Sequence, residues 1–140
     1  MIKIDDFSDL IEKNLAEYGS KVEGIMKTES LKTARAAAKE LRKTSPLKTG
    51  EYENSWKTTE FPAVLGSKYV VHNKKHFQLT HLLEKGHALP GGGRSKKIEH
   101  IKPGETNAKN RFEKNVRKEI ENVTIWFKNN IRKYRIAGGL

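Results

Sequence analysis

Residues 104–135 read GETNAKNRFEKNVRKEIENVTIWFKNNIRKYR, and they give the clearest structural signal in the sequence. Apolar residues recur there at steps of four, four, three, four, four and three, which places them on one side of an α-helix. They are Phe112, Val116, Ile120, Val123, Phe127, Ile131 and Tyr134. The pattern predicts a long amphipathic helix over 104–135, with basic side chains on its other faces.

A second helical stripe runs through residues 1–45, where apolar side chains again recur at three- and four-residue spacing. Gly19 and Gly24 each cost about 1 kcal/mol relative to alanine in a helix interior, so we expect a kink or break near them. Pro46 disfavours helical geometry at the residue before it, Ser45. The sequence therefore predicts an N-terminal helix over 1–45 that ends before the proline.

Residues 46–103 predict a sheet and loop region between the two helices. Residues 55–61 and 63–73 are rich in β-branched and aromatic side chains, and Gly66-Ser67 offers a turn or bulge. This pattern predicts an antiparallel hairpin.

Residues 76–85 have the length and apolar spacing of a short helix, and Gly86 suits its C-terminal cap. Residues 98–102 predict one further strand. The fold class is α+β: a long N-terminal helix, a small antiparallel sheet with a short inserted helix, and a long C-terminal helix. We expect residues 1–140 to form a single domain.

The composition is polar and strongly basic. Apolar residues make up 35% of the chain and charged residues 32%, so we expect a thin core and faces that a partner covers. The net charge is +11, although residues 1–30 carry 4 Lys/Arg against 7 Asp/Glu. A field of this sign attracts polyanions or an acidic protein surface. With no cysteine and no apolar run near the roughly 20 residues of a membrane span, we expect a soluble protein without disulfides.

The sequence carries no recognisable catalytic, cofactor or metal motif. His72 and His76 lie on either side of a predicted strand-to-helix junction. The chain has no cysteine that could complete a zinc site with this pair or with the pair His81 and His87. The run 91–96, GGGRSK, lacks the spacing of a phosphate-binding loop and predicts a flexible basic loop instead. No G-x-S-x-G motif is present. We expect a protein that is not an enzyme and binds no cofactor or metal.

Two motifs in the middle of the chain resemble those of a known family. The first motif is LRKTSPLKTG at 41–50, followed by Tyr52 and by Ser55-Trp56-Lys57. The second is HLLEKGH at 81–87, followed by GGGR at 91–94 and HIKP at 100–103. In this order and between two long helices, they resemble the gene-product-ten-like family of siphophage minor structural proteins, which are described as tail components, neck proteins or tail-completion proteins.

The resemblance covers roughly residues 1–130 and is densest at 41–103. Lys102 and Gly104 differ from the residues that often flank the proline in the family pattern, which puts the start of the last helix in question. The resemblance implies assembly without catalysis: a virion protein at the head–tail junction or in the tail, assembled in the bacterial host cytoplasm. The partners it implies are other phage neck and tail proteins, with no membrane. A thin core with long amphipathic helices also suits a homo-oligomer such as a ring.

Candidate site residues lie within the two motifs. We expect His81, Glu84 and His87 to form a hydrogen-bond cluster that fixes the following loop, or to contact a partner. The partner-binding candidates are His81, Glu84, His87, Gly91, Gly92, Gly93, Arg94, Lys96 and Lys97. The expected structural residues are Ser45, Pro46, Thr49, Gly50, Ser55, Trp56, Gly86, His100 and Pro103, with Trp56 in the core.

Two alternatives stay open beside head–tail joining. A small basic DNA-binding protein of prophage origin fits the charge, although the sequence has no recognisable helix-turn-helix. Non-specific contact of Lys and Arg with the DNA backbone is compatible with either function. A metal-dependent nuclease would need a ligand set that the sequence lacks.

Overall fold

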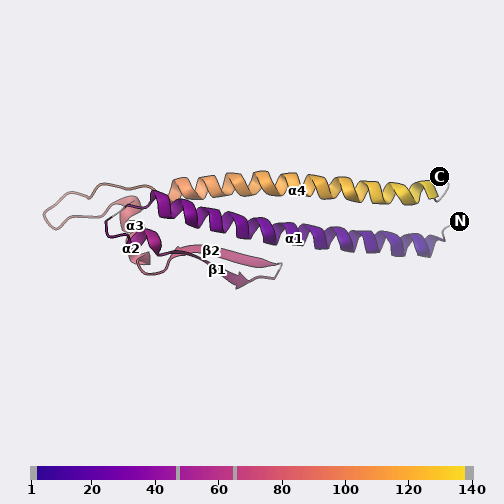
Figure 1. The fold of residues 1–140 in the computed structure, drawn as a ribbon, viewed down its shortest axis with the longest axis horizontal. Helices are drawn as coiled ribbons and strands as arrows, with labels where there is room; N and C mark the ends of the chain where they lie inside the picture. Colours follow the sequence, from indigo (N-terminus) through magenta and orange to yellow (C-terminus); the bar gives the residue numbers. More distant parts are fainter. Residues whose placement is uncertain (1–2, 47, 65, 138–140) are drawn as a thin grey trace.

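The computed structural model describes residues 3–46, 48–64 and 66–137, which form an α+β fold built on two long helices. The elements in chain order are α1 (Ile4–Thr44), α2 (Glu51–Asn54), β1 (Trp56–Pro62), β2 (Ser67–Asn73), α3 (Phe77–Lys85) and α4 (Ile101–Ala137). Helices α1 and α4 lie side by side in opposite directions, so the start of α1 and the end of α4 lie at the same end of the molecule (Figure 1). The predicted fold class is confirmed, and the short helix α2 is an addition to it.

The two long helices pair along the apolar seams that the sequence predicts. The seam residues of α4 from Phe112 to Tyr134 are half-buried. The rings of Tyr18 and Phe127 lie 5.3 Å apart, and 3.4 Å separates the hydroxyl oxygens of Tyr18 and Thr124. Because only α1 covers this part of α4, each seam keeps one flank in solvent. We call this paired region, away from the sheet, the arm.

The basic side chains predicted for the other faces of α4 are exposed, namely Arg111, Lys114, Arg117, Lys118, Lys128, Arg132 and Lys133. Within the described part of the chain, no helix is long and apolar enough to cross a membrane.

Helix α1 continues through Gly19 and Gly24 without interruption, so the expected break is wrong. A Cβ added at either position would meet nothing within 4 Å, which shows that both glycines face open space. Pairing with α4 holds these turns helical despite the unfavourable propensity of glycine. The predicted end of the helix is confirmed, because Ser45 has an extended backbone (φ −66°, ψ 145°) just before Pro46.

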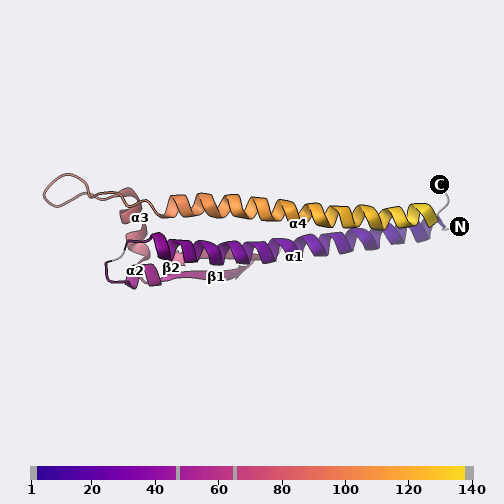
Figure 2. The ribbon, with the colours of Figure 1, turned by 45° about the horizontal axis from the view of Figure 1, so that its top comes forward.

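Strands β1 and β2 form the predicted hairpin, whose inner face packs on α1 (Figure 2). The register pairs Trp56 with Asn73 and Pro62 with Ser67. The Thr58 hydroxyl donates a hydrogen bond of 3.4 Å to the Ala34 carbonyl of α1. Buried small side chains let the hairpin and α4 approach this part of α1 closely, namely Ala34, Ala37 and Ala38. Residue 65 in the hairpin turn lies outside the described residues.

Helix α3 and its end at Gly86 are confirmed, but the predicted strand over 98–102 is wrong. Helix α4 begins at Ile101, three residues before the predicted start. Pro103 is compatible with this start because the N–H groups of a first helical turn have no acceptor within the helix. Gly104 lies inside α4, where an added Cβ would come within 3.3 Å of Leu41 Cδ2.

The buried apolar core lies at the sheet end of the helix pair. Leu41 of α1, Tyr52 of α2 and Trp56 of β1 form its centre. Side chains from the remaining elements pack against this centre, namely Val71, Leu83 and Ile101. The core is thin, as the composition predicts, and every described helix and strand contributes a side chain to it.

We predict that Leu41→Ala lowers the free energy of unfolding by about 3 kcal/mol, because it leaves a cavity at the centre of the core. Leu15→Ala is the matched control, since it makes the same change in the same helix at a side chain that is 53% exposed. We expect a loss below about 1 kcal/mol for the control. Urea denaturation followed by circular dichroism measures both, and equal losses would contradict this position of the core.

Candidate functional site

The residues of the two predicted motifs meet where the long helices join the sheet, and we call this region the junction: Ser45, Tyr52, Trp56, Glu84 and His100. The indole Nε1 of Trp56 donates a hydrogen bond of 2.8 Å to Ser45 Oγ. The Arg42 guanidinium donates a bond of 2.7 Å to the Trp56 carbonyl. Trp56 is 3% exposed, so its expected place in the core is confirmed. These bonds fix the end of α1 against the first strand.

His100 is a fully enclosed polar side chain of the junction, with 2% of the residue exposed. Its Nδ1 lies 2.8 Å from the Ile98 carbonyl and 3.3 Å from the Glu84 carboxylate, so this nitrogen carries a proton. Its Nε2 lies 2.9 Å from the Tyr52 hydroxyl. Burial, together with the negative charge of Glu84, raises the pKa of Tyr52 to about 12. Tyr52 therefore stays a phenol at neutral pH, with its hydroxyl hydrogen-bonded to His100 Nε2.

Glu84 of α3 caps the first turn of α4. Its carboxylate accepts hydrogen bonds from the backbone N–H groups of His100, Ile101 and Lys102, at 2.9, 3.0 and 2.8 Å. The next residue, Pro103, has no N–H. Burial by itself would raise the pKa of Glu84, but the three backbone donors and nearby His100 lower it below its usual value. An ionised carboxylate also interacts favourably with the positive end of the helix dipole.

Residues 87–97 form a loop that extends beyond the junction at the end opposite the arm (Figures 1 and 2). At its base the Ser95 N–H donates to the His87 carbonyl at 2.8 Å, and the His87 N–H donates to Ser95 Oγ at 2.9 Å. Arg94 donates to the Gly86 carbonyl at 3.2 Å. All of the loop candidates are exposed residues, although Arg94 also makes this bond at the base: Gly91, Gly92, Gly93, Arg94, Lys96 and Lys97.

The expected cluster of His81, Glu84 and His87 is wrong. Glu84 bonds to the start of α4, and His87 bonds to Ser95 through its backbone and also through Nδ1, at 2.9 Å from Ser95 Oγ. His81 is exposed on α3. The three side chains have different partners because Glu84 faces the junction while His87 lies beyond Gly86, where the chain leaves α3.

Two structural residues of the junction were not among the predicted candidates. Asn73 is 1% exposed, donates to the Tyr52 carbonyl at 2.8 Å and accepts from the His76 N–H at 2.9 Å. Ser95 closes the base of the loop. Nothing in the local sequence distinguishes these two residues from ordinary polar residues near turns.

Thr49 and Gly50 shape the chain after α1, as expected. Gly50 has a positive φ of 79° and begins α2, and its carbonyl accepts a bond of 2.7 Å from the Asn54 side chain. The Thr49 hydroxyl accepts from the Glu51 N–H at 3.4 Å.

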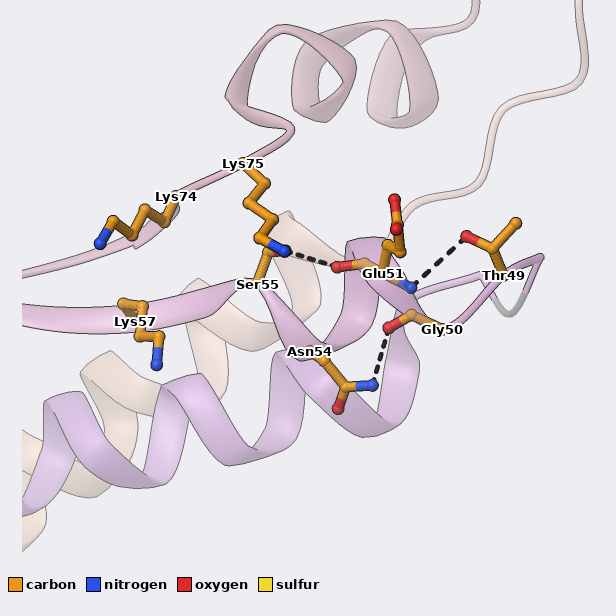
Figure 3. Close-up of a pocket in the computed structure, with 8 residues that line it drawn as sticks. All are labelled: Thr49, Gly50, Glu51, Asn54, Ser55, Lys57, Lys74 and Lys75. Atoms are coloured by element: carbon orange, nitrogen blue, oxygen red, sulfur yellow. Dashed lines mark hydrogen bonds between the residues drawn. The ribbon is translucent and has the colours of Figure 1, made fainter.

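A pocket of about 420 Å³ lies between this turn and the base of the hairpin (Figure 3). Lys57, Lys74 and Lys75 line it together with α2, and all three lysines are exposed. Glu51 is the carboxylate among the lining residues, so the pocket is positively charged on balance. Lys57 belongs to the first motif, but none of the three lysines was among the predicted candidate residues.

The junction is a structural centre in which the His100 side chain is enclosed on all sides. Among residues 3–46, 48–64 and 66–137, no group of three His, Cys, Asp or Glu side chains could hold a metal ion.

Comparisons of this chain with known protein families, with curated proteins and with solved structures found no match. The family resemblance therefore rests on the two motifs alone.

We predict that Glu84→Gln lowers the free energy of unfolding by about 2 kcal/mol at pH 7, since a charged acceptor of three bonds is lost. The folded pKa of Glu84 is lowered, so its contribution is present above the unfolded pKa and is lost as the pH falls through the folded pKa. The difference between wild type and variant should thus shrink below about pH 4.

Glu99→Gln is the matched control, because Glu99 is exposed in the same segment. We expect little change from it at any pH. Denaturation at several pH values measures both variants, and a difference for Glu84→Gln that persists unchanged at low pH would contradict the capping role.

We predict that Gly86→Ala lowers the free energy of unfolding by about 1–3 kcal/mol and displaces the base of the loop. Gly86 has φ 70° and ψ 166°, a region that side chains strongly disfavour, and an added Cβ would lie 2.8 Å from the Ser95 carbonyl oxygen. Gly91→Ala is the control, since its Cβ would meet nothing within 4 Å. Thermal unfolding and the NMR shift of the Ser95 amide distinguish the two, and equal behaviour would contradict this account.

Proposed function

We propose that this chain is a non-enzymatic structural protein of a tailed bacteriophage that helps to join head and tail through protein–protein contacts. One observation carries the proposal: both motifs that resemble the phage family are used to build a single junction, and that junction supports an exposed loop. Glu84, His100, Ser45 and Trp56 all belong to these motifs and hold one another in place.

In this proposal the loop over 87–97 is the docking element. Its base is tied by Ser95 and Arg94, while its tip consists of exposed glycines that leave the backbone open to a partner. Gly92 and Gly93 have positive φ values of 91° and 84°, so the turn depends on them. Arg94, Lys96 and Lys97 give the loop a charge that suits an acidic neighbour.

The arm is the second surface that a partner would cover. Phe7 and Leu15 on α1 are 46% and 53% exposed, although they belong to the apolar stripe. In the proposed assembly, neighbouring copies or other neck proteins cover this flank of the seam, as in an oligomeric ring around the head–tail joint.

A phage with a stop codon at Glu12 of this gene should produce filled heads and separate tails that fail to join, because the docking loop and the junction are both missing. Electron microscopy of the lysate measures this outcome. Complementation with the wild-type chain should restore joined particles.

A second complementing variant, Arg94→Ala/Lys96→Ala/Lys97→Ala, tests the loop itself and should restore fewer infectious particles than wild type. The matched control Lys114→Ala/Lys118→Ala/Lys128→Ala removes the same charge from α4 and should complement better. Normal, infectious particles from the stop-codon phage would contradict the proposal.

A further inference from the structure

None of the described helices lies over the outer face of the β1–β2 hairpin, which faces away from α1 (Figures 1 and 2). Side chains alternate across a strand, and buried Trp56 and Asn73 mark the face that packs on α1 and the junction. The opposite face therefore carries every second residue of the two strands. We call it the outer ribbon face: Lys57, Thr59, Phe61, Lys68, Val70 and His72, followed by Lys74 and Lys75 beyond the end of β2.

The outer ribbon face contains lysines and no carboxylate from either strand. Glu60, the acidic residue of β1, lies on the inner face, where its carboxylate accepts bonds from Ser67 and Tyr69. At the other end of the ribbon, Lys57 pairs with His72, and Lys74 follows the last residue of β2.

Lys75 and these two lysines line the pocket described above (Figure 3). Among the described residues, no ion pair within 4 Å involves any of the three. Like charges placed together on a sheet are destabilising, so the fold itself gives no reason for this arrangement. A bound polyanion would remove the repulsion.

We propose that the outer ribbon face binds the phosphodiester backbone of duplex DNA, with Lys57, Lys74 and Lys75 as the main phosphate contacts. A two-stranded ribbon fits the major groove, which is about 12 Å wide. Thr59 and His72, whose Oγ1 and Nε2 lie 2.8 Å apart, add hydrogen-bonding groups between the cations. Phosphate contacts carry no sequence information, so the binding is non-specific.

Helix α4 is the competing basic surface, and its charge is arranged differently. Acidic residues lie among its lysines and arginines as far as Glu121, namely Glu105, Glu113, Glu119 and Glu121. Beyond Glu121 the basic residues lie toward the end of α4, next to the start of α1 with Asp5 and Asp6 (Figure 1). The field of α4 is therefore partly cancelled locally, whereas Lys57, Lys74 and Lys75 line one pocket. The ribbon is therefore the stronger phosphate site of the two.

This inference goes beyond head–tail joining and does not depend on it. DNA binding is measured on the purified chain, and joining is measured in lysates, so each proposal can fail separately.

The experiment compares wild type with Lys57→Gln/Lys74→Gln/Lys75→Gln by fluorescence anisotropy of a labelled DNA duplex of mixed sequence at several salt concentrations. The variant should bind at least about tenfold more weakly at low salt. The slope of log affinity against log salt should fall in magnitude by about 2–3, since each phosphate contact contributes about 0.9. The control Lys114→Gln/Lys118→Gln/Lys128→Gln removes the same charge and should change affinity by less than about threefold.

Circular dichroism melting of all three proteins checks that each is folded, as expected for substitutions at exposed lysines. An equal loss in both variants would overturn the proposal, because total charge would then explain the binding. Absence of salt-dependent binding by wild type would overturn it as well. Competition by poly-glutamate as effective as that by DNA would also overturn it, and would point to an acidic protein as the partner.

Discussion

The carboxylate of Glu84 at the start of α4 is the interaction on which the rest of the structure depends. Three consecutive N–H groups of the first turn would otherwise lie unpaired next to the core, at a cost of about 1–3 kcal/mol for each buried group. By accepting them, α3 fixes where α4 begins and in which direction it leaves the core. Because α4 is 37 residues long, a small change in its direction at the start would produce a large displacement at the end of the arm.

The residues that stabilise the fold and the surfaces that are open to a partner lie in different parts of the molecule. The core of Leu41, Tyr52 and Trp56 lies at one end, and the arm beyond it has seams that are only half-buried. The loop over 87–97 and the outer ribbon face are held by the core without contributing to it. Most side chains on these surfaces are exposed, so the surfaces are free to accept a partner.

The motifs that give the sequence its family resemblance turn out to be largely structural. Ser45 and Trp56 bond to each other, His100 bonds to Tyr52, and Glu84 caps a helix. Their histidines and carboxylate suggest chemistry when the sequence is considered alone. In the structure Glu84 and His100 are enclosed, and the groups available to a partner are the exposed glycines and cations of the loop and of the outer ribbon face.

The sequence by itself determined both long helices, the hairpin, α3 and the place of Trp56 in the core, because periodicity and turn residues are local signals. It also located the exposed basic loop. Only the tertiary structure decided that α1 continues through Gly19 and Gly24, because pairing with α4 outweighs local propensity. The same holds for the start of α4 at Ile101, the separate partners of Glu84 and His87, and the convergence of Lys57, Lys74 and Lys75. Each of these depends on residues distant in sequence, and a contact between distant residues leaves no periodic pattern in the chain.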